Sequence, residues 1–285
     1  MVILVGLVIE GGANRTYYSV GVLDAFLDYG IDADLLVGVS AGIANGVSFI
    51  SGQRGRSLKI AMEYVNDPRY MGLKYFLKKG NKSYYNRDFV FNQLPNKELP
   101  FDYSAFDRFE GDVYAVVTNL KTGLPEYIEV SGEDKDWKLL QASCALPFMF
   151  PPIEIDGNSY FDGGCADPLP VEFARKRGCD KIITILTREI EYVKSAERDV
   201  EFSAFAYRRH KNFASALKNR SDVYNKSKEM LAELEKNGSA FTFAPLSTIG
   251  WSRTEKDTSK LKAMYDEGYN DAVRRMDELK KFLEN

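Results

Sequence analysis

The sequence contains very little histidine and cysteine, and its net charge is small. Among its 285 residues are one histidine, His210, and three cysteines, Cys144, Cys165 and Cys179. Because the cysteines are odd in number and lack metal-ligand spacing, we expect neither a disulfide framework nor a metal site, but reduced thiols in a cytoplasmic protein. The net charge of −3 at pH 7 argues against nucleic acid as a partner.

Long hydrophobic runs are also missing. The apolar start, MVILVGLVI, is too short to cross a bilayer, and it has neither the basic residues nor the cleavage site of a signal peptide. The chain also lacks linkers, repeats and low-complexity tracts. Since 45% of the residues are apolar and 28% are charged, as in ordinary globular proteins, we predict a single domain over residues 1–285.

The chain begins with an alternation of strand and helix patterns. Continuous apolar runs predict buried strands at 2–9 and 35–39, and helical spacing predicts helices at 17–28 and from 41 onward. This order predicts an α/β fold with a mainly parallel central sheet and helices packed on it. Further strands are expected at 112–120, 125–130, 181–187 and 240–246, with a short pair inside 151–164. Further helices are expected at 137–146, 170–178, 203–236 and 259–283.

The pattern Gly-x-Ser-x-Gly stands where the second of these strands passes into a helix. Its residues are Gly38, Ser40 and Gly42. A tight strand-to-helix turn of this kind, called a nucleophile elbow, lifts the serine hydroxyl above the sheet at a helix N-terminus. Because the pattern is short, a chance match in a glycine-containing turn is the alternative.

A serine hydroxyl attacks well only when a base takes its proton, and His210 is one candidate. The order Ser40, Asp162, His210 agrees with the triad order of α/β-hydrolases. However, only one strand–helix unit precedes Ser40, whereas those hydrolases have several strands before the nucleophile. The arginines and lysines around His210 also disfavour an imidazolium ion there, so a solvated helix face is the competing interpretation.

The other candidate base is Asp162, in the segment YFDGG. It ends an expected strand, and Gly163 and Gly164 after it allow another backbone to come close. An ordinary aspartate has a pKa of about 4, so partial burial would be needed to make it a useful base at neutral pH. A surface turn is the alternative, and the pairing with the serine motif favours the base.

The segment EGGANR, directly after the first strand, is a candidate oxyanion hole. Gly11, Gly12 and Ala13 would offer backbone N–H groups to the negative oxygen of a tetrahedral intermediate. Because parallel strands end at the same edge of a sheet, this loop is expected beside Ser40. Arg15 would brace the loop or attract an anionic head group. A purely structural turn stays open, and the glycine spacing does not match the dinucleotide-binding G-x-G-x-x-G.

Taken together, these motifs resemble the patatin-like phospholipases, which use a Ser–Asp dyad. The resemblance covers residues 3–190 and includes ASCALPFMFPP at 142–152. It implies a three-layer α/β/α sandwich, with Ser40 as the nucleophile and Asp162 as the base. Gly11 and Gly12 would supply the oxyanion hole, and Arg15 would be the arginine of the loop.

The loop departs from the family pattern G-G-G-x-R-G at two positions, Ala13 and Thr16. An alanine still donates its N–H, but a positive φ angle costs it about 1 kcal/mol or more. We expect hydrolysis of a lipid ester without a cofactor or metal, and transient contact with a membrane surface. A non-catalytic lipid-binding module on the same scaffold is the remaining alternative.

Residues 64–109 contain twelve tyrosines and phenylalanines. They would form either a cap that holds an acyl chain or the packing of a sheet edge. From the sequence we favour the sheet edge.

Overall fold

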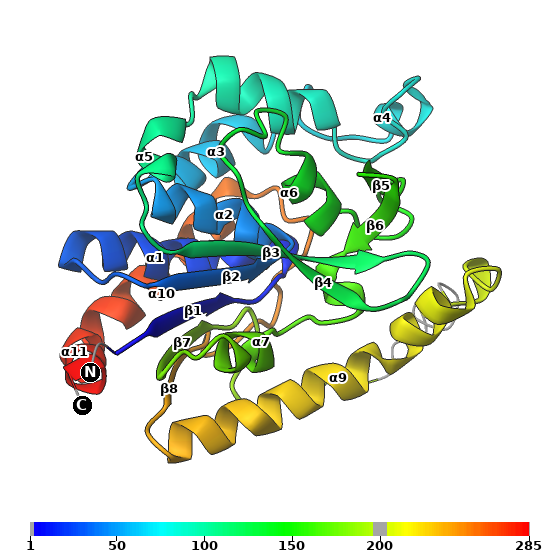
Figure 1. Cartoon of the computed structure of the whole chain (residues 1–285). Coiled ribbons are helices and arrows are strands. Elements are labelled where there is room, and N and C mark those ends of the chain that lie inside the picture. The colour runs from blue at the N-terminus through cyan, green and yellow to red at the C-terminus, as the bar shows by residue number, and fades with distance from the viewer. Residues whose placement is uncertain (1–2, 196–203, 285) are drawn as a thin grey trace.

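The computed structural model describes residues 3–195 and 204–284, and its core is one mixed, mostly parallel sheet (Figure 1). Five strands run parallel in the order β3, β2, β1, β7, β8. Their bounds are β1 Val5–Ile9, β2 Leu35–Val39, β3 Asp112–Asn119, β7 Lys181–Ile185 and β8 Ala240–Phe243. Three antiparallel strands extend the sheet beyond β2 around β3: β4 Pro125–Glu129, β5 Ile153–Ile155 and β6 Asn158–Asp162. The predicted α/β fold with a mainly parallel sheet is confirmed.

Side-chain alternation along the strands gives the sheet two buried faces. Leu7 and Ile9 of β1 belong to a core formed with α1 (Tyr17–Tyr29) and α2 (Ala41–Ile50). Val8, between them, belongs to the opposite core, with α7 (Val171–Lys176) and α9 (Lys211–Lys236). Residues that bury both faces of a sheet in this way are typical of a three-layer arrangement. Helices therefore cover both sides of the sheet in Figure 1.

Two glycines allow α10 (Thr258–Arg274) to pack closely on α1. A Cβ atom at Gly21 would lie 2.0 Å from the carbonyl oxygen of Tyr265, and one at Gly268 would lie 2.0 Å from that of Tyr18. Any larger residue would push the helices apart. The segment near the C-terminus thus packs directly on the first helix of the chain.

Several predicted boundaries differ from the observed ones. The strand expected from 240 to 246 ends at Phe243, because Pro245 nearby has no N–H for a ladder hydrogen bond. The closing helix expected at 259–283 is two helices, α10 and α11 (Met276–Glu284). The long helix expected at 203–236 begins as α9 only at Lys211. Residues 2 and 203, at the ends of two predicted elements, lie outside the described residues.

The aromatic-rich segment lies over α2 and adds no strand to the sheet in the part that the structure describes. This segment, residues 64–109, starts at the last residue of α3 (Arg56–Tyr64) and forms α4 (Lys74–Leu77), η2 (Phe89–Glu98) and α5 (Tyr103–Asp107). Tyr70, Tyr85, Phe91 and Phe101 face a cavity beside α2, whereas Phe106 lines a separate hollow with Val113 of β3. The interpretation as sheet-edge packing is therefore wrong for the cavity-lining residues. None of the described helices combines the length and apolar character needed to cross a bilayer.

Candidate active site

Two strands that meet head to head bring Ser40 and Asp162 together. β2 runs parallel to β3 and ends at Val39, which pairs with Val116. β6 runs antiparallel to β3 and ends at Asp162, which pairs with the next residue, Val117. Since β4 occupies the opposite edge of β3, β2 and β6 share one edge and their carboxyl ends converge. The residue after β2 and the last residue of β6 therefore lie beside each other.

Ser40 has the strained backbone of a nucleophile elbow. Its φ is +55° and its ψ is −129°, between the end of β2 and the start of α2. This conformation is rare for a residue with a side chain and is found mainly where function requires it. The neighbouring motif positions are too crowded for a side chain: a Cβ at Gly38 would lie 2.7 Å from the backbone of Ile43, and one at Gly42 would lie 2.6 Å from the carbonyl oxygen of Ile9.

Ser143, at the end of α6 (Lys138–Ser143), holds the elbow in place. Its buried hydroxyl accepts the Ser40 N–H at 2.9 Å and donates to the Val116 carbonyl at 2.7 Å. One side chain thus connects the turn to β3. No sequence pattern indicated this role, although Ser143 lies within the segment ASCALPFMFPP.

Asp162 is buried, with one carboxylate oxygen bonded and the other open. Oδ1 accepts the N–H of Gly164 at 2.8 Å, while Oδ2 accepts no hydrogen bond of normal geometry within the described part of the chain. Burial raises the pKa of Asp162 above its ordinary value, and the Ser40 side chain, the Gly164 N–H and the charge of Arg220 lower it in part. The Ser40 hydroxyl is thus close enough to Asp162 to lower the pKa of its carboxyl group.

The two glycines after Asp162 begin η3 (Gly163–Cys165) and fit tightly against their surroundings. A Cβ at Gly163 would lie 2.2 Å from the carbonyl oxygen of Val116. Gly164 accepts a hydrogen bond from Arg220 Nε of α9 at its carbonyl oxygen. The sequence does not single out Arg220, because nothing local relates it to a turn 56 residues earlier in the chain.

The glycine loop lies beside Ser40, as its place after β1 predicts. A Cβ at Gly11 would lie 2.8 Å from the Val39 carbonyl oxygen and 3.0 Å from Ser40 Cβ. The N–H groups of Gly11, Gly12 and Ala13 donate no hydrogen bond to any described residue. Three adjacent donors next to a serine hydroxyl are suited to an oxyanion. Ala13 has a φ of +48°, so the expected backbone strain is present.

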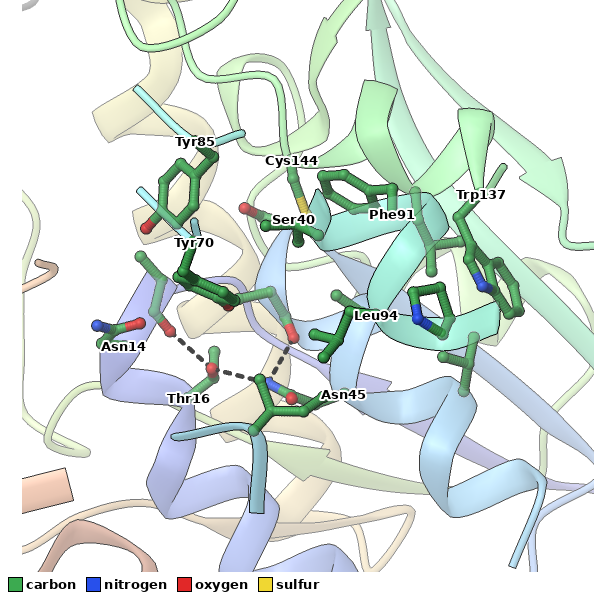
Figure 2. A pocket seen from close by; sticks show the side chains of 18 of the residues that line it. Asn14, Thr16, Ser40, Asn45, Tyr70, Tyr85, Phe91, Leu94, Trp137 and Cys144 are labelled. Atoms are coloured by element: carbon green, nitrogen blue, oxygen red, sulfur yellow. Dashed lines mark hydrogen bonds between the residues drawn. The ribbon is translucent and has the colours of Figure 1, made fainter. Parts of the chain in front are cut away.

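Buried polar contacts fix this loop on both sides. Glu10 Oε2 accepts the Thr187 N–H at 2.6 Å, and the Thr187 hydroxyl donates to the Gly11 carbonyl at 3.1 Å. At the other end, the Thr16 hydroxyl donates to the Ala13 carbonyl at 2.6 Å and accepts from Asn45 Nδ2 at 3.0 Å (Figure 2). Thr16, where the family pattern has glycine, therefore ties the loop to α2.

An apolar cavity of about 350 Å³ extends from Ser40 along α2. Figure 2 shows Ser40 and Cys144 at its wall together with Phe91, Leu94 and Trp137. Cavities of this size that are lined mainly by apolar and aromatic side chains commonly bind small organic ligands. The cavity is chemically suited to a hydrocarbon chain.

His210 lies away from this arrangement. It is an exposed residue directly before α9, and it lines neither the apolar cavity nor the other cavity that Ser40 lines. The geometry therefore gives no support to a triad through His210. Among residues 3–195 and 204–284, no group of three or more His, Cys, Asp or Glu side chains is arranged to hold a metal ion. All three cysteines are unpaired.

Two models of protein families match separate parts of this chain. A family model described as patatin-like phospholipase matches residues 7–175, and one described as a domain of unknown function (DUF6363) matches residues 210–284. The sequence is similar to the uncharacterized protein YjjU of Escherichia coli, with 30% identity over 64% of this chain and 52% of that protein. It is also similar to lysophospholipase NTE1 of Kluyveromyces lactis, with 31% identity over 64% of this chain and 12% of that protein.

Among solved structures, that of VipD from Legionella pneumophila aligns over 97% of this chain and 67% of its own, with a TM-score of 0.47 and 12% identity. The chain spans about half the length of the bacterial sequence relative and about a tenth of the fungal one.

Proposed function

Because this chain belongs to the patatin-like phospholipase family, we propose that it is a serine acyl hydrolase acting on the carboxylic esters of phospholipids or related lipids. Ser40 attacks the ester carbonyl and Asp162 accepts the serine proton. The tetrahedral intermediate then breaks its ester C–O bond, and the alcohol leaves with the proton from Asp162, which regenerates the carboxylate and leaves the acyl-enzyme. Water activated by the same carboxylate then releases the fatty acid. We place this reaction in the cytoplasm, with transient contact at a membrane surface.

The observation that carries the proposal is that a strained, nucleophile-elbow serine and a buried carboxylate with an open oxygen line the same cavity. Oδ2 of Asp162 accepts no hydrogen bond of normal geometry from the described residues, so it is available for the Ser40 proton. Burial favours the protonated carboxyl, which makes the carboxylate a stronger base than an exposed one.

The glycine loop has the chemistry to stabilise the tetrahedral intermediate. Fixed N–H donors that point at a developing oxyanion typically contribute a few kcal/mol each to transition-state stabilisation. Gly11, Gly12 and Ala13 have N–H groups that no described acceptor uses. The macrodipole of α2, whose N-terminus follows Ser40, favours negative charge at the same place.

The apolar cavity provides the binding energy for the acyl chain. Each buried CH₂ group contributes about 0.8 kcal/mol when it leaves water. Tyr70, Phe91, Leu94 and Trp137 line the cavity next to Ser40. A chain bound there would hold its ester carbonyl against the serine hydroxyl.

Fatty-acid release from phospholipids, lysophospholipids and p-nitrophenyl esters tests the proposal. We expect Ser40→Ala and Asp162→Asn each to lower kcat by about a thousandfold or more. His210→Gln and the exposed Ser215→Ala serve as controls and should stay within about twofold of the parent. Collapse of activity in His210→Gln would favour the Ser–His–Asp esterase, and an inactive parent would favour the lipid-binding module.

A further inference from the structure

A second, smaller cavity adjoins Ser40 and differs from the first in its chemistry. Its volume is about 40 Å³, and Ser40, Ala13, Leu146 and Arg253 line both cavities. A polar cavity needs only about 10–15 Å³ to hold one water molecule, so this one has room for the oxygens of a small polar group. Ser40 thus lies at the junction of an apolar and a polar cavity.

Positive charge dominates the walls of the small cavity. Five cationic side chains line it, against two carboxyl groups, Glu10 and Asp162. The cationic residues are Arg15, Arg188, Lys194, Arg220 and Arg253. They come from separate segments of the chain, and the fold brings them together at the serine. Clustered arginines of this kind are typical of sites for phosphate and carboxylate groups.

Arg15 shows that the charge in this cavity is incompletely satisfied by the protein. The residue is 6% exposed, and its Nε has no hydrogen-bond partner among the described residues. Burial, together with the charges of Arg188 and Arg253, lowers the pKa of Arg15 to about 10. A buried guanidinium without a full set of acceptors is costly, and an anion in the cavity would remove that cost.

We propose that the small cavity binds the phosphate of a lipid head group while the ester carbonyl lies at Ser40 and the acyl chain occupies the apolar cavity. The inference rests on the proposed hydrolase function and narrows its substrates to acyl esters that carry a phosphate close to the ester. Arg253 and Arg188 act as specificity-determining residues, because they face the cavity from outside the oxyanion loop.

The C-terminal part of the chain positions this phosphate site. Arg220 and Arg253 both lie within residues 210–284, outside the patatin-like match. The Asn14 N–H of the oxyanion loop donates to the Arg253 carbonyl at 3.2 Å, and Asn14 Nδ2 donates to the Glu255 carbonyl at 2.6 Å. Arg188 Nη1 donates to the Thr248 hydroxyl at 2.6 Å. Head-group selection would thus depend in part on residues 210–284, which match a domain of unknown function.

A matched pair of substrates tests the proposal. Lysophosphatidic acid and a monoacylglycerol with the same acyl chain differ only in the phosphate. We expect Arg253→Gln and Arg188→Gln each to lower the ratio of kcat/KM for lysophosphatidic acid to kcat/KM for monoacylglycerol by about tenfold or more, mainly through the KM for lysophosphatidic acid. Arg253→Lys should retain part of the preference, and Lys218→Gln, on the exposed side of α9, should change neither substrate. Equal losses on both substrates, or none, would overturn the phosphate site.

A binding measurement separates this inference from the hydrolase proposal. In the Ser40→Ala variant, calorimetry should detect glycerol 3-phosphate binding that Arg253→Gln weakens by about tenfold or more. Binding of glycerol 3-phosphate by a protein that hydrolyses neither ester would overturn the hydrolase and keep the anion site. Hydrolysis of the esters by a protein that does not bind glycerol 3-phosphate would support the hydrolase proposal and overturn the anion site. If inorganic phosphate binds as tightly as glycerol 3-phosphate, the cavity holds free phosphate and the head-group assignment is wrong.

Discussion

Ser40 and Asp162 lie side by side at one cavity because Val116 and Val117, adjacent residues of β3, pair with the ends of two different strands on the same edge. Val116 pairs with Val39 at the end of β2, and Val117 pairs with Asp162 at the end of β6. The two strands run toward each other, so the distance between the two side chains is set by backbone hydrogen bonds. An arrangement held by a sheet is more rigid than one held by loops. The proposed chemistry depends on this register.

The pH dependence of hydrolysis should report the buried carboxylate. Burial disfavours the ionised form of Asp162, so its pKa in the folded protein lies above the ordinary value. The base is therefore lost as the pH falls through this raised pKa, and kcat/KM should decline at a higher pH than an exposed carboxyl would give. A pH–rate profile of kcat/KM with a neutral ester measures it.

Arg220→Gln provides the matched test of that pH profile. The charge of Arg220 lowers the pKa of Asp162, so removing it should move the acidic limb to still higher pH. If the acidic limb of the kcat/KM profile moves to lower pH in Arg220→Gln, or does not move at all, a group other than Asp162 controls the reaction.

Ala13→Gly should stabilise the protein. A left-handed backbone costs a non-glycine residue about 1–2 kcal/mol, and the greater freedom of glycine in the unfolded chain offsets part of that gain. With φ at +48° for Ala13, we expect the free energy of unfolding to rise by up to about 1 kcal/mol in urea titrations. Ala216→Gly, inside α9, is the control and should cost about 1 kcal/mol. A loss of stability in Ala13→Gly would mean that the loop gains more from the alanine methyl group than it loses in strain.

Ser143→Ala should weaken both stability and catalysis. The substitution leaves the Ser40 N–H and the Val116 carbonyl without their buried partner, at a cost of about 1–3 kcal/mol. The midpoint temperature of thermal unfolding and kcat should both fall, because the elbow loses its connection to β3. The exposed Ser215→Ala should change the free energy of unfolding by less than about 0.5 kcal/mol. Unchanged kcat in a destabilised Ser143→Ala protein would limit the role of this contact to folding.

Val47→Phe should shorten the acyl chains that the protein accepts. Val47 lines the apolar cavity two helical turns after Ser40 on α2, about 10 Å along the helix. A larger side chain there should lower kcat/KM for dodecanoyl and longer esters by about tenfold and leave acetyl esters within about twofold. Equal loss for all chain lengths would indicate damage to the elbow and would contradict the assignment of this cavity to the acyl chain.

The sequence predicted the elements that carry the site better than the contacts that assemble it. The strand at 35–39, the elbow at Ser40 and the loop after β1 follow from apolar runs and glycine spacing, which are local signals. The meeting of β2 and β6 does not, because strand neighbours depend on pairing between distant segments. The sequence motif suggested that Asp162 would approach Ser40, but only the register of β3 explains how.

The residues that line the cavities, and those that hold the site in place from distant parts of the chain, were harder to predict from the sequence. Ser143 and Arg220 act through single hydrogen bonds to backbone atoms far away in the chain, and no spacing rule identifies such contacts. The aromatic residues of 64–109 gave no period that distinguishes packing on a sheet from lining a cavity. Arg253 lies in a loop with irregular structure, where sequence patterns indicate little about position.

Labelling with a fluorophosphonate probe, followed by peptide mass spectrometry, tests the central claim most directly. Parent protein and His210→Gln should carry the adduct on Ser40 at similar rates, whereas Asp162→Asn should react at least about a hundredfold more slowly and Ser40→Ala should not react at this position. An adduct on another residue, or an Asp162→Asn protein that labels at the parental rate, would contradict the Ser40–Asp162 pair.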